Sequence, residues 1–190
     1  PFIPTPREVG DNKNGQVVDP AACMVDYMAT LPNVHLPALD YGLDFGVAQL
    51  AFVDTNHLDS DTAKIVHDTF TDKTSWNILL GHHVLKTYHD KESEDYVRPW
   101  LQEHAIAPDL YANGHAHVLQ FGIYNNVPAI TSGTGAKLRK RKTCPPDCGD
   151  GQLWGESQPG YATLTITATR IDVVFKNDKG EELYQWFKTK

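Results

Sequence analysis

The sequence predicts an α/β fold built on a mixed β-sheet. Two apolar runs of strand length, residues 47–54 and 76–80, are each followed by a segment with helical periodicity. From residue 109 onward, strand patterns follow one another closely without intervening helices. Alternating strands and helices favour parallel pairing, whereas consecutive strands joined by short turns favour antiparallel pairing. The sheet is therefore expected to contain both.

The first half of the chain contains the predicted helices. Residues 1–46 are rich in Pro, Gly, Asn and Asp, and they predict a loop-rich lead-in with one short helix at residues 21–30. The first helix after the strand at 47–54 is expected at residues 60–70, with Asp and Ser at its start. The strand at 76–80 is stopped by Gly81, and residues 93–104 are expected to form the next helix.

The second half is expected to be mostly strand. Residues 109–112, 118–124 and 128–132 are strand candidates. Residues 133–160 contain Gly, Pro and a basic run at 138–142, which predicts one long loop. The remaining segment, 161–190, is expected to form a terminal β-hairpin region, with strands at residues 162–167, 171–176 and 183–187.

Charge and hydropathy exclude two classes of partner. Seventeen basic residues against twenty-four acidic ones give a net charge of −7, which disfavours binding to nucleic acid. No apolar run approaches the roughly 18 to 20 residues of a membrane-spanning helix, so we expect no membrane-spanning segment in this chain.

The cysteines bear on localisation. Cys144 and Cys148 lie in a Cys-Pro-Pro-Asp-Cys sequence whose prolines favour a closed loop, while Cys23 has no evident partner. A disulfide between Cys144 and Cys148 would place the chain in an oxidising compartment, in the secretory pathway, extracellular or lumenal.

Two histidine motifs carry the strongest functional signal. Gly81-His82-His83 follows the strand at 76–80, and Gly114-His115-Ala116-His117 follows the strand at 109–112. Ligands bind at the carboxyl ends of strands in open α/β sheets, and loops there can direct several imidazoles into one crevice. We therefore expect His82, His115 and His117 to converge on a metal ion.

These motifs resemble those of the calcineurin-like metallophosphoesterases, and within them the purple (tartrate-resistant) acid phosphatases. Residues 78–83 resemble the strand-Gly-His-x-Pro motif of the family, although Val84 stands at the proline position. Residues 111–120 resemble its Gly-His-x-His segment, including the trailing Leu-Gln. Residues 131–135 resemble its Ser-Gly-x-Gly turn, and Gly160-Tyr161 leads into similar closing strands.

The resemblance implies a fold and a domain organisation. The fold would be part of a β-sandwich flanked by helices, and the chain would be the C-terminal part of a single metallophosphoesterase domain, with the first strands missing. Within residues 1–190, the part with the His motifs would span 47–132, between the lead-in at 1–46 and the long loop at 133–160.

The resemblance also implies the chemistry of the site. A complete protein would hold two divalent or trivalent metal ions, Fe, Zn or Mn, and hydrolyse a phosphate ester. His82 and His115 would bind the second metal, and His117 the first. His89 lies at about the interval where the phosphatases carry a histidine that contacts the substrate, so it would bind phosphate or protonate the leaving alcohol.

The family motifs that precede these histidines are incomplete here. Residues 9–15, Val-Gly-Asp-Asn-Lys-Asn-Gly, allow two alignments. If they replace Gly-Asn-His-Asp, Asp11 takes the place of a metal-binding Asn and Asn12 that of the catalytic His. If they replace the bridging Gly-Asp-Asn-aromatic motif, Asp11 bridges the metals and Lys13 stands where an aromatic residue is usual. We prefer the first alignment, because the spacing of residues 24–43 then fits.

These departures lead to three hypotheses. Three imidazoles and one carboxylate hold one metal at most, so phosphomonoester hydrolysis would require the missing N-terminal half of the same protein as a partner. Alternatively, the chain is a catalytically impaired pseudophosphatase that serves as a binding or anchoring scaffold, which would explain Asn12. A third hypothesis is a structural mono-zinc site in a secreted binding module.

Overall fold

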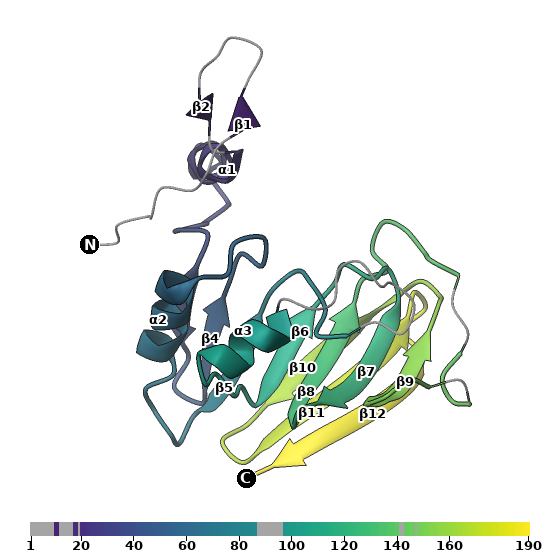
Figure 1. The fold of residues 1–190 in the computed structure, drawn as a ribbon. Coiled ribbons are helices and arrows are strands. Elements are labelled where there is room, and N and C mark those ends of the chain that lie inside the picture. Colours follow the sequence, from purple (N-terminus) through teal and green to yellow (C-terminus); the bar gives the residue numbers. More distant parts are fainter. Residues whose placement is uncertain (1–9, 12–16, 19, 87–96, 141–142, 147) are drawn as a thin grey trace.

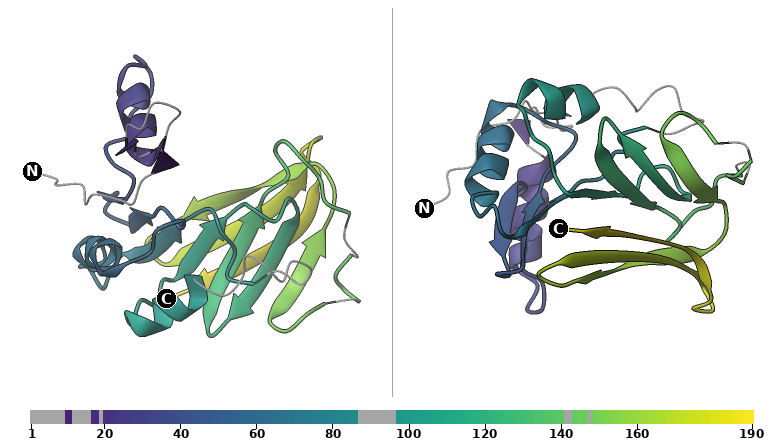
Figure 2. Two further views of the ribbon diagram at one scale, coloured as in Figure 1. Left: turned by 45° about the horizontal axis from the view of Figure 1, so that its top comes forward. Right: turned by 90° about the horizontal axis from the view of Figure 1, so that it is seen from below.

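The computed structural model describes residues 10–11, 17–18, 20–86, 97–140, 143–146 and 148–190. Two β-sheets pack face to face, and helices cover the outer face of the larger sheet (Figures 1 and 2). The elements in chain order are β1 (Gly10–Asp11), β2 (Val17–Val18), α1 (Pro20–Ala29), β3 (Tyr41–Asp44), β4 (Ala48–Phe52), α2 (Ser60–Thr69), β5 (Trp76–Leu80), α3 (Val97–Glu103), β6 (Leu110–Asn113), β7 (Leu119–Tyr124), β8 (Val127–Ser132), β9 (Gln152–Glu156), β10 (Gly160–Ile166), β11 (Arg170–Asn177) and β12 (Glu182–Thr189).

The larger sheet is mixed, as predicted. Its strand order is β3-β4-β5-β6-β8-β7-β9. The central strands β4, β5, β6 and β8 pair in parallel, whereas β3 and β7 run antiparallel to their neighbours. Strands β10, β11 and β12 form the second, fully antiparallel sheet. The β-sandwich flanked by helices that the sequence predicted is therefore confirmed.

The central strands are buried on both faces because each sheet face has its own core. In β5, Ile78 packs between the two sheets, and Leu79 packs under the helices. In β6, Leu110 likewise packs between the two sheets, and Tyr111 packs under the helices. Double burial explains why these strands are continuous apolar runs in the sequence.

Helices α2 and α3 lie on the face of the larger sheet opposite to β10–β12 (Figure 2). α2 begins where its sequence predicted, because the Asp59 carboxylate accepts a hydrogen bond from the backbone N–H of Thr62 at 2.8 Å. The helix expected at 93–104 is present as Val97–Glu103, and its expected first residues, 93–96, lie outside the described residues. Among the described helices, none is both long and apolar enough to span a membrane.

Two regions contain strands where loops were expected. The lead-in includes β3, the edge strand of the larger sheet. Its Gly42 makes it a weak strand pattern, yet α2 requires this glycine, because a Cβ there would lie 2.0 Å from Thr69 Oγ1. The strands β1 and β2, with α1, lie to one side of both sheets (Figure 1).

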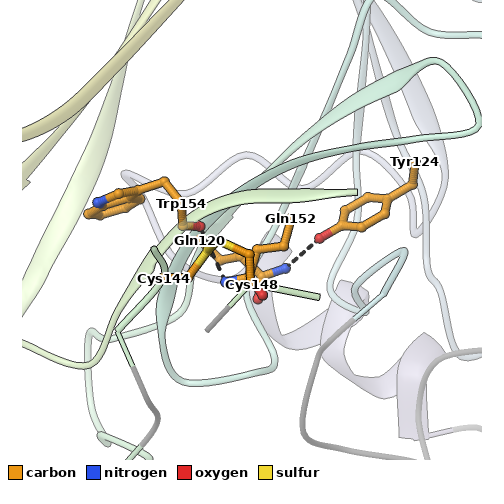
Figure 3. Close-up of a disulfide and its surroundings, with 6 residues drawn as sticks. All are labelled: Gln120, Tyr124, Cys144, Cys148, Gln152 and Trp154. Atoms are coloured by element: carbon orange, nitrogen blue, oxygen red, sulfur yellow. Dashed lines mark hydrogen bonds between the residues drawn. A yellow bond between two sulfur atoms is a disulfide. The ribbon is translucent and has the colours of Figure 1, made fainter. Parts of the chain in front are cut away.

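The segment expected to be one long loop contains strand β9. Its glycine-rich flanks conceal the strand, whose Trp154 is buried between the sheets. The Cys144–Cys148 disulfide is present, as predicted, beside β7 and β9 (Figure 3). Cys144 exchanges two backbone hydrogen bonds with Gly155 of β9, at 2.9 and 3.0 Å, so the disulfide loop is tied to this sheet edge.

Candidate metal centre

The two histidine motifs are neighbours because the strands that precede them are neighbours. β5 and β6 pair in parallel, with Leu80 opposite Ala112, so both motifs leave the same edge of the sheet. The backbone N–H of Gly114 donates to the carbonyl of His82 at 3.2 Å and joins the two turns directly. Register and strand order thus bring together motifs that are about thirty residues apart in the chain.

Three imidazole rings meet at this edge. His82 Nε2 and His115 Nδ1 are 3.1 Å apart, and the two rings lie edge to face with centroids 5.0 Å apart. The His83 ring lies 5.1 Å from that of His82 and 4.5 Å from that of His115. The structure therefore brings the rings of His82, His83 and His115 together, while the predicted convergence of His82, His115 and His117 on a metal ion is still a prediction.

The spacing of the paired nitrogens fits a shared cation. Nitrogens bound tetrahedrally to Zn²⁺ at 2.0–2.1 Å lie about 3.3 Å from each other, close to the 3.1 Å between His82 and His115. Within the described ranges, however, no group of three or more His, Cys, Asp or Glu residues is arranged to hold a metal ion. The separation of the two nitrogens is thus compatible with a shared cation, while metal binding at this edge, mononuclear or dinuclear, is still a prediction.

His117 occupies the same loop but not the imidazole cluster. His115 and His117 have positive φ angles of 39° and 52°, a strained conformation for residues other than glycine that is often found at functional sites. The loop packs tightly against Gly133, where a Cβ would lie 2.8 Å from the backbone nitrogen of His117. His117 Nδ1 is buried, and none of the residues that the structure describes gives it a hydrogen-bond partner, as expected for a nitrogen that binds a group supplied from elsewhere.

The other predicted site residues are not brought to this edge by the described part of the structure. Asp11 belongs to β1, in the small sheet beside α1 and apart from the larger sheet (Figure 1). Asn12 and His89 lie outside the described residues. Their proposed roles remain predictions from the sequence.

Thr55 and His83 also lie at this edge; the sequence placed His83 in the first histidine motif without a role, and it did not indicate Thr55. Thr55 follows β4, and its Oγ1 lies 2.7 Å from Nδ1 of His83. Burial is the main cause that lowers the pKa of His83 to about 4, and positive charge on His115 and His82 lowers it further, against the opposing effect of Asp54. The sequence did contain a signal for Thr55, because it is a polar residue just after β4, and β4 pairs in parallel with the strand before the first histidine motif.

The basic run at 138–142 begins next to the histidine loop. The backbone N–H of Arg139 donates to the carbonyl of His117 at 3.1 Å, which holds the start of the run against that loop. Lys137 and Lys140 are exposed, and residues 141–142 lie outside the described residues. Exposed basic residues therefore flank the segment that contacts the histidine loop, and their charge would attract an anionic ligand to this region.

Comparison with known sequences finds plant purple acid phosphatases. No family model matches the chain. Purple acid phosphatase 4 of Arabidopsis thaliana is 33% identical over 124 residues, which cover 60% of this chain and 35% of that protein. Purple acid phosphatase 17 of the same plant is 31% identical over 126 residues, covering 62% and 36%. The matched region thus spans about a third of the length of these curated relatives.

Comparison with solved structures finds proteins that share the fold of this chain. GAP50, described as the anchor in the inner membrane complex of Plasmodium, superposes with a TM-score of 0.59 at 20% identity, covering 81% of this chain and 55% of that one. PhoD superposes with a TM-score of 0.58 at 11% identity, covering 85% and 42%. The chain is therefore similar in sequence to purple acid phosphatases over about 60% of its length, and it shares the fold of GAP50 and PhoD.

Proposed function

We propose that the chain supplies part of the metal centre of a phosphoesterase that hydrolyses phosphomonoesters. The observation that carries this proposal is the 3.1 Å separation of His82 Nε2 and His115 Nδ1, two nitrogens from different strand ends that share one small space. The sequence similarity to purple acid phosphatases supports the reaction class.

Each histidine has a distinct part in this proposal. His82 and His115 donate lone pairs to one cation, and His117, through a nitrogen buried without a partner, binds the other. The sequence alignment assigns a carboxylate ligand to Asp11, although β1 lies apart from this sheet edge in the structure. His89 donates a proton to the leaving alcohol, and Asn12 occupies the place of a second catalytic histidine, where it offers an amide instead of an acid.

The chain's own residues position and attract the ester. When bound, two metal ions of the Fe, Zn or Mn class supply an activated water as nucleophile and positive charge for the oxygens of the phosphoryl group. Lys137 and Lys140 raise the local concentration of anionic substrate. We further propose that the remaining ligands come from an N-terminal part of a longer protein, because the matched region spans only about a third of the relatives.

Metal-binding measurements test whether His82 and His115 share a cation. Zn²⁺ and Mn²⁺ titrations followed by calorimetry are expected to show one cation per chain of 190 residues, with binding lost in His82→Ala and in His115→Ala. His35→Ala, a substitution of an exposed histidine in the loop before β3, is the matched control and is expected to bind normally. Equal binding by all four proteins would refute the proposed site.

Turnover separates the phosphatase from the other two hypotheses. The native protein is expected to hydrolyse a generic aryl phosphate, with activity abolished by His115→Ala and retained by His35→Ala. Bound metal without turnover would support the scaffold hypothesis instead. Unfolding of the chain by a chelator, without binding of any phosphate ester, would support a structural zinc site.

The disulfide supports a localisation. Cysteine pairs persist in oxidising compartments and are rare in the cytosol, so we propose that the Cys144–Cys148 bond forms in the secretory pathway and that the protein is lumenal or extracellular.

A further inference from the structure

Three nitrogen atoms of His82 and His83 surround the Thr55 hydroxyl beside the imidazole cluster. The backbone N–H groups of His82 and His83 donate to Thr55 Oγ1 at 3.3 and 3.1 Å, and Nδ1 of His83 lies 2.7 Å from the same oxygen. Thr55 is 1% exposed, so water does not replace any of these contacts. A single buried side chain thus holds the turn that carries the histidines.

The number of hydrogen bonds that a hydroxyl can accept and donate decides which atom donates in the contact between Thr55 Oγ1 and His83 Nδ1. A threonine hydroxyl has two lone pairs and one proton. The two backbone N–H groups use both lone pairs, so the proton is left for Nδ1 of His83, and within the described part of the chain Thr55 has no other acceptor. Were Nδ1 protonated, Oγ1 would face three donors, and its own proton would be buried without an acceptor, which is unfavourable.

We propose that Thr55 is a positioning residue that fixes His83 as the neutral Nε2–H tautomer and thereby leaves cation binding to His82 and His115. In that tautomer, Nδ1 of His83 accepts from Thr55 and Nε2 carries a proton, so neither nitrogen offers a lone pair to a cation. His82 Nε2 and His115 Nδ1 form a hydrogen bond with each other at 3.1 Å, and a cation bound between them would replace the proton that they share. The cation-binding role of His82 and His115 rests on the proposed function, whereas the tautomer of His83 does not.

The orientation of His82 depends on the same hydroxyl. Its backbone N–H is held by Thr55 and its carbonyl accepts from Gly114, so both peptide groups that flank its side chain are fixed. Partners that orient metal ligands in this way typically contribute about 10- to 100-fold to metal affinity. Loss of the Thr55 hydroxyl should therefore weaken cation binding without removing a ligand.

The tautomer is measured by long-range ¹H–¹⁵N correlation spectra of the 190-residue chain labelled at histidine, with His83 assigned from a His83→Gln variant. In the wild type and in Thr55→Ser, we expect His83 to carry its proton on Nε2, before and after Zn²⁺ is added. In Thr55→Val, which removes the hydroxyl at constant volume, we expect a mixture of tautomers and a Zn²⁺ dissociation constant raised about 10- to 100-fold. Calorimetry supplies the dissociation constant.

A matched control separates positioning from stability. Thr62→Val removes the hydroxyl of another buried threonine, whose Oγ1 contacts Asp40 and the carbonyl of His57 instead of a histidine ring. We expect it to lower stability while leaving the His83 tautomer and the Zn²⁺ affinity unchanged.

Either of two results would overturn the proposal. One is a wild-type His83 protonated on Nδ1, which is decisive even when Thr55→Val does not fold. The other is a Thr55→Val protein that keeps the wild-type tautomer and a Zn²⁺ affinity within about twofold of wild type, against the expected loss. If the wild type binds no Zn²⁺, the proposed function fails, whereas the tautomer still decides the role of Thr55.

Discussion

At residue 81 the backbone has no room for a side chain. A Cβ on Gly81 would lie 2.5 Å from Thr55 Cγ2 and 2.7 Å from the hydroxyl oxygen of Tyr111. That hydroxyl donates to the carbonyl of His83, so both neighbours of Gly81 hold the histidine turn. The glycine is required because the turn is packed from both sides by the groups that orient it.

Gly81→Ala tests this packing. The added methyl group must displace Thr55 or Tyr111, so we expect the free energy of unfolding to fall by about 1–3 kcal/mol and Zn²⁺ binding to weaken. Gly135→Ala is the matched control, because a Cβ there meets no atom within 4 Å. Urea unfolding of both variants measures the effect, and equal stability of the two would contradict the packing argument.

The depressed pKa of His83 predicts a pH dependence of stability. Between its ordinary value of 6.5 and its folded value of about 4, the unfolded chain binds a proton at this position and the folded chain does not. Stability is therefore expected to fall as the pH is lowered from about 6.5 towards 4. The groups that set this shift are His82, His115 and Asp54, besides burial.

His83→Gln, which cannot titrate, isolates this contribution. Urea unfolding at pH 7 and pH 5, without added metal, is expected to show a smaller loss of stability for the variant than for the wild type. A wild-type protein that loses no more than the variant would exclude a depressed pKa at His83.

At the scale of elements, the disulfide loop forms one edge of the larger sheet. The Cys144–Cys148 bond lies beside β9, and Gln120 of β7 donates to the Tyr124 hydroxyl at 2.8 Å nearby (Figure 3). Gln120 also donates to the carbonyl of Lys86 at 3.1 Å, the last described residue after the Gly81–His83 turn. The edge with the disulfide is thus connected to the segment that leaves the histidine turn.

Removal of the disulfide should lower stability modestly. Because the bond closes a very short loop, loop entropy predicts a loss of about 2 kcal/mol in Cys144→Ala/Cys148→Ala. Cys23→Ala, at the exposed free cysteine of α1, is the matched control and is expected to be neutral. Denaturation curves of the three proteins provide the comparison, and a double variant as stable as wild type would show that the loop needs no covalent closure.

For the whole molecule, the contact between the two sheets decides stability. Phe175 of β11 is completely buried against Trp154 of β9, with ring centroids 4.8 Å apart, and Trp154 stacks on Tyr184 of β12 at 5.1 Å. The indole N–H of Trp76 donates to the carbonyl of Thr167 at 2.7 Å and ties β5 to the turn between β10 and β11. The terminal strands therefore support the strand that carries the first histidine motif.

Phe175→Ala measures the strength of this contact. A buried Phe→Ala change is expected to cost about 3–5 kcal/mol, because the sandwich cannot close around the cavity. Phe45→Ala is the matched control, since Phe45 is 62% exposed, and it is expected to change stability little. Thermal unfolding of both variants tests the prediction, and a loss at Phe175 as small as that at Phe45 would mean that the second sheet contributes little.

Much of the fold was predictable because its signals are local. The apolar run at 76–80 coincides with β5, and Asp59 with the following residues marks the start of α2. β3 and β9 were missed, because Gly42 and the glycines around β9 weaken the strand pattern, and only packing against α2 and between the sheets makes these segments strands. The disulfide was predictable for the same reason, since its sequence signal, two close cysteines around prolines, is also local, and the structure contains the bond.

That His82 and His115 each follow a buried strand and a glycine was predictable, because strand pattern and motif are contiguous in the chain. The 3.1 Å between their nitrogens, the contact with His83 and the hold of Thr55 on the turn depend on the fold, because strand order and register place three separate strand ends at one edge. These contacts are long-range, and no local pattern encodes which side chains meet.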